Sequence, residues 1–130
     1  MKQRTPGAYH LILRVHRRVA LRVGRLGAVS FPAGWYVYTG SAMGGVEARV
    51  ARHRRRQKPL HWHIDYLLGA AELVDVVVVP ARRRLECERN RIVLSLPGAR
   101  VGAPRFGSGD CRCPSHLAYF GLTRPQIPAP

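Results

Sequence analysis

The sequence predicts a small α+β domain in which a short antiparallel sheet, beginning as a three-stranded meander, is flanked by helices. Between Gly7 and Val15 every second side chain is apolar, which is typical of a half-buried strand. Between Val46 and Arg56 apolar side chains instead recur at the spacing of a helix. We found no internal repeat or linker. We therefore expect one domain over residues 1–121, followed by a flexible proline-rich tail at 122–130.

The first three strands are expected to pair in chain order. After the strand at 7–15, a short turn at 16–18 leads into a second strand at 19–26, where valine and leucine alternate with other residues. The third strand covers 35–39, which is rich in aromatic and β-branched side chains.

The rest of the chain alternates between helices and strands. A helix at 46–56 is followed by a short helix at 61–68. An apolar, β-branched segment at 72–79 predicts a buried strand closed by a proline. The longest predicted helix covers 82–96, with Leu85, Ile92 and Leu96 on its apolar stripe. A loop at 107–116 and a short strand at 117–120 complete the domain.

The net charge limits the choice of partner. The chain has 130 residues, of which 22 are basic and 7 acidic, giving a formal net charge of +15. Of the residues, 46% are hydrophobic, and a chain of this length can bury on the order of 60–70% of its unfolded surface when it folds. The charge therefore lies on a folded domain. Nucleic acid, an anionic membrane surface or an acidic macromolecule would suit such a surface, and nucleic acid is the first choice.

The apolar segments are too short for a signal-peptide core or for the roughly 20 residues of a membrane helix. We expect a cytoplasmic protein without a membrane partner. In a reducing compartment Cys87, Cys111 and Cys113 favour thiols or metal ligands over disulfides, and three cysteines cannot all pair within one chain.

A cysteine-rich segment has the chemistry of a zinc site. Cys111 and Cys113 precede His116 in the predicted loop, and Cys87 supplies a possible fourth ligand. The alternative is a pair of buried thiols beside a hydrogen-bonded loop histidine. Both interpretations stay open at this point.

Two short glycine and tyrosine patterns stand at either end of the predicted meander. They are Gly7-Ala8-Tyr9 and Tyr38-Thr39-Gly40; after them come Arg49 and His53 on one helix and Glu86 on a later one. This combination resembles the GIY-YIG endonuclease superfamily. The later blocks, such as His61-Trp-His-Ile-Asp-Tyr and Phe106-Gly-Ser-Gly-Asp-Cys, look like a compact bacterial and archaeal branch of it, whose members are mostly domains of unknown function.

The resemblance implies a GIY-YIG-like fold and a metal-dependent endonuclease that hydrolyses DNA phosphodiester bonds with little sequence specificity, in DNA repair or processing. Glu86 would hold Mg²⁺ or Mn²⁺. Tyr9 or Tyr38 would act as the general base, Arg49 would contact the phosphate, and His53 would assist proton transfer. The residues expected to support this site are Gly7, Gly40, Ser41, His61, His63, Asp65 and Asp110.

Each of these residues also has an ordinary structural interpretation. Glu86 could form a surface ion pair with a nearby arginine, and the tyrosines could be packed strand residues. Several superfamily members carry an asparagine about three turns beyond the metal glutamate, where this chain has Gly98. A catalytically inactive nucleic-acid-binding module is therefore the alternative function.

Two basic runs flank the predicted site in the sequence. They predict a surface that follows the phosphate backbone of DNA, or of RNA, without reading the bases. Its members are Arg52, Arg54, Arg55, Arg56, Lys58, Arg82 and Arg83. The oligomeric state stays open.

Overall fold

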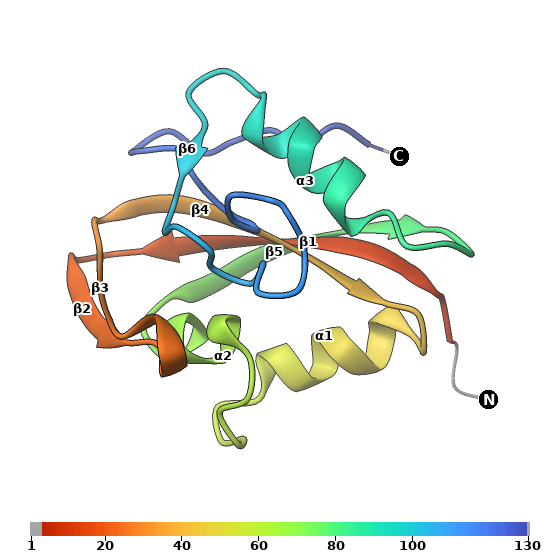
Figure 1. Ribbon diagram of the computed structural model, residues 1–130, viewed down its shortest axis with the longest axis horizontal. Coiled ribbons are helices and arrows are strands. Elements are labelled where there is room, and N and C mark those ends of the chain that lie inside the picture. Colours follow the sequence, from red (N-terminus) through yellow and green to blue (C-terminus); the bar gives the residue numbers. More distant parts are fainter. Residues whose placement is uncertain (1–3, 130) are drawn as a thin grey trace.

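The α+β class is confirmed in the computed structural model, which describes residues 4–129 (Figure 1). A five-stranded antiparallel sheet has the order β5-β1-β4-β7-β6, and β2 and β3 form a separate two-stranded hairpin. The elements are β1 (Gly7–Val15), β2 (Val19–Arg22), the 3₁₀ turn η1 (Gly24–Leu26), β3 (Ala28–Phe31), β4 (Gly34–Ala42), α1 (Val46–Arg54), α2 (His63–Leu68), β5 (Glu72–Pro80), α3 (Glu86–Leu94), β6 (Arg100–Val101) and β7 (Leu117–Tyr119).

The predicted meander is wrong. Strand β1 is the second strand of the sheet and pairs with β4 on one side and β5 on the other, whereas β2 pairs with β3. The turn between β2 and β3 explains this local pairing. Gly24 and Gly27 flank it with positive φ angles of 46° and 77°, which reverse the chain so that β2 meets the residues directly after it. Neither β3 nor β6 was predicted.

The sheet separates two cores, with α1 and α2 on one face and α3 on the other (Figure 1). Because side chains alternate along β1, Tyr9, Leu11 and Leu13 join the core beneath α1 and α2. Ile12 points to the opposite face and packs with Val93 of α3. The period-two pattern of β1 is thus confirmed with its predicted bounds.

Two other predictions about burial are wrong. Strand β5 is an edge strand in which Val79 alone is buried and Val78 is 37% exposed, because only β1 pairs with it. On α3 the buried residues are Arg89, Asn90 and Val93, whereas Ile92, placed on the predicted apolar stripe, is 39% exposed. The buried face of α3 is partly polar because it hydrogen-bonds to the sheet and to the loop before β7.

The segment after β7 contacts the body of the domain. The Arg89 guanidinium donates a hydrogen bond of 2.7 Å to the carbonyl of Pro128, and Ile127 packs against the core beneath α3. The flexibility expected for residues 122–130 stays a prediction. Within residues 4–129 no helix has the length and apolar character needed to cross a membrane.

Candidate active site and metal centre

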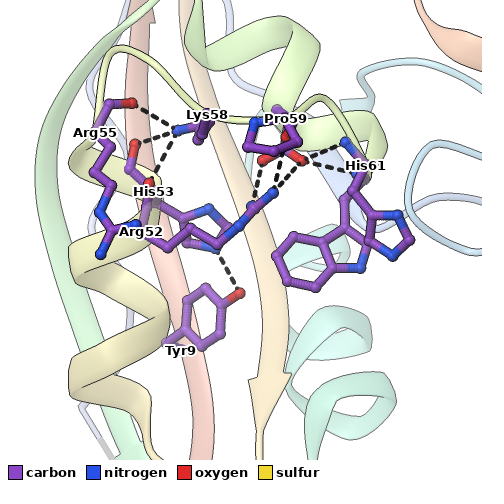
Figure 2. Close-up of polar contacts among 9 residues, drawn as sticks. Tyr9, Arg52, His53, Arg55, Lys58, Pro59 and His61 are labelled. Atoms are coloured by element: carbon purple, nitrogen blue, oxygen red, sulfur yellow. Dashed lines mark hydrogen bonds and ion pairs between the residues drawn. The ribbon is translucent and has the colours of Figure 1, made fainter.

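A tyrosine and a histidine from different elements meet beneath α1. Tyr9 lies near the start of β1 and His53 in the last turn of α1, and the Tyr9 hydroxyl is 2.8 Å from His53 Nε2 (Figure 2). The spacing of Val46, Val50 and His53 on one face of α1 had placed this histidine toward the core, and it is 3% exposed. The contact between them joins two of the predicted catalytic residues.

Burial controls the ionisation of this pair. It lowers the pKa of His53 to about 4, and the positive charge of Lys58 acts in the same direction. Burial also raises the pKa of Tyr9 to about 12, although the charge of Arg49 partly offsets this effect. At neutral pH the pair therefore consists of a neutral imidazole and a protonated phenol. His53 Nδ1 has no hydrogen-bond partner among the described residues.

Tyr38 lies beside this pair on the neighbouring strand. Its ring centroid is 6.5 Å from that of Tyr9 and 6.4 Å from that of His53. Burial, reinforced by the charges of Tyr9 and Glu86, raises the pKa of Tyr38 well above its ordinary value. Both tyrosines of the two glycine and tyrosine patterns thus line one site, and both are protonated there.

Arg49 is held at the edge of the same site by two contacts. Its guanidinium donates a hydrogen bond of 3.0 Å to the Ser41 carbonyl and stacks on Trp62 at 4.4 Å from the ring centre. Because a guanidinium has five N–H donors, these contacts leave others for a ligand. Ser41, predicted to support the site, contacts Arg49 through its backbone carbonyl. This contact does not depend on the serine side chain.

Glu86, the first residue of α3, approaches the tyrosines from a different element. Its negative charge raises the pKa of both Tyr9 and Tyr38, so it lies within electrostatic reach of the two hydroxyls. Its side chain is 28% exposed and pairs with Arg84 at 3.4 Å. The carboxylate therefore makes the surface ion pair considered for it, and its charge also acts on the two tyrosines.

Trp62 is the residue that the sequence analysis missed. Arg49 and Arg52 both stack on its ring, with the Arg52 guanidinium 4.3 Å from the ring centre. Arg52 also donates to both carboxylate oxygens of Asp65, at 2.8 and 3.1 Å. Trp62 was visible in the sequence as part of the His-Trp-His block. Nothing in the sequence placed its ring between two arginines.

Asp65 stabilises the fold beside the site. It is buried, and it accepts hydrogen bonds from Arg52 and from the backbone N–H groups of His61 and Trp62. Burial alone would raise the pKa of Asp65, but these hydrogen bonds hold it below its ordinary value. The predicted supporting role thus takes the form of a buried ion pair that fixes Arg52 and the start of α2.

The remaining supporting residues surround Tyr38. A pocket of about 310 Å³ is lined by Tyr38, His61, His63 and Asp110, together with Trp62 and two glycines. His63 Nδ1 accepts a hydrogen bond of 2.8 Å from the backbone of Gly107, which ties α2 to the loop before β7. The structure therefore brings these three polar residues to one wall of the site.

Two predicted glycines allow close packing. A Cβ atom on Gly40 would lie 2.6 Å from the hydroxyl of Tyr9, and one on Gly7 would lie 2.4 Å from the carbonyl of Val79. Contacts this short would force a shift of the neighbouring atoms. Gly40 therefore makes room for the Tyr9 side chain at the point where it meets His53.

The basic residues divide into two groups. Arg54, Arg55 and Arg56 are exposed at the end of α1 and, with His53 and Lys58, line a cavity of about 590 Å³. Other members of the predicted set have partners within the protein. Lys58 Nζ donates to three carbonyls at the end of α1, Arg52 binds Asp65, and Arg83 pairs with Glu88 at 2.8 Å, while Arg82 is exposed.

A second cluster lies at the first turn of α3. The ligand atoms of Cys87, Cys111, Cys113 and His116 all lie within 4.8 Å of one another, so the group could bind zinc. Cys87 comes from the first turn of α3 and the other three from the loop before β7. Burial raises the pKa of Cys87 to about 12, so without a metal ion this thiol is neutral at pH 7.

A buried polar network connects α3 to β1 and to that loop. Arg89 Nε donates to His10 Nε2 at 3.2 Å, and His10 Nδ1 contacts the Thr39 hydroxyl at 2.8 Å. Asn90, the chain's single asparagine, donates to the Ser115 carbonyl at 2.7 Å. It therefore holds the loop that carries the cysteines.

Fold and site together define a basic α+β domain with a tyrosine–histidine pair beneath α1 and a Cys₃His cluster at the first turn of α3. The chain belongs to the DUF123 family, described as a domain of unknown function, and the family match covers residues 8–128. Neither the curated proteins nor the solved structures contain a match. The family match carries no statement about the GIY-YIG superfamily, so that relationship stays a prediction.

Proposed function

We propose that this domain is a metal-dependent endonuclease that hydrolyses DNA phosphodiester bonds with little sequence specificity. The observation that carries the proposal is the 2.8 Å contact between the Tyr9 hydroxyl and His53 Nε2, within reach of the charges of Arg49 and Glu86. Hydrolysis of a phosphodiester needs a proton acceptor for water, a cation at the phosphate and stabilisation of the leaving oxygen. These four residues offer the first two functions at one place.

Tyr9 is the better candidate for the general base. A buried phenol whose pKa is about 12 does not ionise by itself at neutral pH. The neutral imidazole of His53 solves this difficulty in the tautomer that carries its proton on Nδ1. The Tyr9 hydroxyl then takes a proton from the attacking water while its own proton moves to His53 Nε2, so no free phenolate forms. No such acceptor is recorded for the Tyr38 hydroxyl within residues 4–129, which leaves Tyr38 to position water or phosphate.

Arg49 suits the phosphate. Its contacts with the Ser41 carbonyl and the Trp62 ring fix the guanidinium plane in advance, so less conformational entropy is lost when it binds two phosphate oxygens. Positioned donors of this kind act on the charge that develops in the transition state.

Glu86 is suited to a divalent cation in a limited sense. It is a single carboxylate and, among the described residues, belongs to no group of three or more candidate ligands. Mg²⁺ is commonly held by one or two carboxylates, with water and substrate phosphates completing the shell, so one glutamate is sufficient. When bound, such an ion polarises the phosphate and stabilises the leaving oxygen. The Arg84 contact at 3.4 Å is long and exposed, and it would have to open.

The exposed arginines at the end of α1 supply a surface for the DNA backbone. Arg54, Arg55 and Arg56 line the cavity that also reaches His53, so a phosphate chain lying there would lead toward the site. Binding of this type weakens steeply with added salt and does not depend on sequence.

The GIY-YIG relationship is part of this proposal. It is supported by the pairing of β1 with β4, which sets Tyr9 opposite Gly40, by the contact of Tyr9 with His53, and by the charges of Arg49 and Glu86 that act on both tyrosines. The position of the family asparagine falls on Gly98, outside α3.

The test compares Glu86→Ala with Glu88→Ala. Glu88 lies on the same helix and also pairs with an arginine, but it faces solvent, so it is a matched control. With Mn²⁺ and labelled DNA, Glu86→Ala should abolish cleavage and keep DNA binding, whereas Glu88→Ala should cut like the parent. Cleavage by Glu86→Ala at the parental rate would show that the assignment of this residue is wrong.

A DNA-binding module without catalysis is the second candidate. The raised pKa of both tyrosines favours it, because each is protonated in the absence of a metal ion. Binding of DNA by the parental protein with no metal-dependent product would select this function.

A further inference from the structure

All three cysteines of the chain converge on one histidine. Cys87 stands at the start of α3, and Cys111 and Cys113 stand in the loop that leads to His116. The segments are far apart in sequence, so the fold itself creates the group. Cys113 and His116 are 7% and 2% exposed, which means that the cluster is mostly shielded from water.

The distances suit a tetrahedral metal site. Zinc binds cysteine sulfur at about 2.3 Å and histidine nitrogen at about 2.0–2.1 Å, so a tetrahedron sets sulfur and nitrogen about 3.6 Å apart. His116 Nε2 lies 3.3 Å from the sulfur of Cys111 and 3.8 Å from that of Cys87. Little movement is needed for both sulfurs and the nitrogen to bind one ion.

His116 is oriented as a ligand. Its Nδ1 lies 2.9 Å from the Thr39 carbonyl, and since a carbonyl only accepts, Nδ1 must carry the proton. The lone pair of the neutral ring is then on Nε2, the atom that faces the cysteine sulfurs. A backbone carbonyl that fixes the tautomer in this way is the usual outer partner of a metal-binding histidine.

Hydrogen bonds within the protein hold the cysteine loop in its conformation. The Arg105 guanidinium donates to the carbonyls of Cys113 and Cys111 at 2.9 and 3.1 Å. The backbone N–H groups of Arg105 and His116 donate to Pro114 and Phe106, both at 2.7 Å. Arg105 has a positive φ of 62°, an uncommon conformation for a residue other than glycine, and these contacts maintain it.

We propose that Cys87, Cys111, Cys113 and His116 bind one Zn²⁺ ion in a closed structural site that fastens the first turn of α3 to the loop before β7. With four protein ligands the ion has no open position for water or substrate, so its role is structural. Cys87 places the cluster at the first turn of α3, and His116 places it beside β4, where its ring contacts the Thr39 carbonyl.

The site also positions the proposed nuclease residues, and this part rests on the proposed function. Cys87 directly follows Glu86, and Thr39, which orients His116, directly follows Tyr38. Binding of the ion would therefore fix the backbone beside two residues of the catalytic site.

The first experiment measures metal content and coordination. Protein purified without chelators should contain one zinc per chain, and replacement by Co²⁺ should give the intense visible absorption of tetrahedral cobalt with thiolate charge-transfer bands. Cys111→Ser should lose the metal, whereas His16→Ala, which removes an exposed histidine paired with Glu72, should keep it. Zinc-free protein that takes up no Co²⁺ would overturn the proposal.

The second experiment avoids variants that fail to fold. Because the chain has three cysteines and all belong to the cluster, titration of native parental protein with a mercurial should release one zinc as three thiols react. Immediate reaction of all three thiols without metal release would contradict the site. Neither readout depends on DNA cleavage, so a zinc-loaded protein that cuts no DNA would refute the nuclease alone.

Discussion

Replacement of Tyr9 by phenylalanine tests the proposed proton transfer from water through the Tyr9 hydroxyl to His53. The change removes only the hydroxyl that lies 2.8 Å from His53 Nε2. His53 Nδ1 already lacks a partner among the described residues, so the variant leaves a buried imidazole with both nitrogens unsatisfied. An orphaned buried polar group of this kind costs about 1–3 kcal/mol of folding stability.

The variant should lose cleavage activity by more than its loss of folding stability can explain. A positioned general base contributes about 10²–10⁴-fold to the rate, so metal-dependent cleavage by Tyr9→Phe should fall by that factor. Single-turnover cleavage of labelled DNA and urea denaturation are the two measurements. Comparison of both at a temperature where the variant stays folded separates the chemical effect from unfolding.

Tyr36→Phe is the matched control. Tyr36 is also buried and donates a hydrogen bond of 2.6 Å, but its acceptor is the Pro32 carbonyl rather than His53. This control should lose about 1 kcal/mol of stability and cut DNA at the parental rate. Tyr9→Phe that cuts like the parent, together with an inactive Tyr38→Phe, would refute the choice of Tyr9 as base.

Two further predictions concern stability and packing. Burial lowers the pKa of both His10 and His53 from 6.5 to about 4, so between these pH values the unfolded chain binds more protons. The free energy of unfolding, measured by urea denaturation, should therefore fall as the pH decreases through this range, by up to about 3 kcal/mol for each histidine; a flat profile would contradict the burial argument. Gly40→Ala should displace Tyr9, cost about 1–3 kcal/mol and reduce cleavage, whereas Gly44→Ala, in open space, should change neither; equal behaviour of the two variants would be inconsistent with the packing described.

Local patterns in the sequence predicted the elements of the fold well. The period-two pattern gave β1 with its correct bounds, and the helical spacing from Val46 to His53 gave the buried face of α1. Both patterns depend only on residues that are close together in the sequence. The helices themselves are shorter than predicted, because Lys58 and the turn before it end α1 at Arg54 and because α3 begins only at Glu86.

Pairing between strands was not predictable in the same way. Alternation shows that β2 is a strand, but its partner depends on the turn that follows and on the position of β4, far along the chain. Strand β5 has the composition of a buried strand, yet it lies at the sheet edge because the topology gives it one neighbour. Strand pairing and strand position depend on contacts between distant parts of the chain.

In the candidate site, too, the sequence predicted individual residues but not the contacts between distant elements. The family resemblance singled out Tyr9, His53 and Glu86, and the cysteine and histidine chemistry singled out the four candidate zinc ligands, among them the distant Cys87. The stacking of two arginines on Trp62 was not visible, since it depends on how α1 meets the start of α2.

The most direct test of the proposed nuclease activity is a cleavage assay on the parental protein. Labelled single-stranded, duplex and branched DNA is incubated with Mn²⁺ and, in parallel, with EDTA, and the products are resolved on a denaturing gel. We expect cleaved products with Mn²⁺ and intact DNA with EDTA. DNA that is bound but uncut under both conditions would contradict the proposed activity.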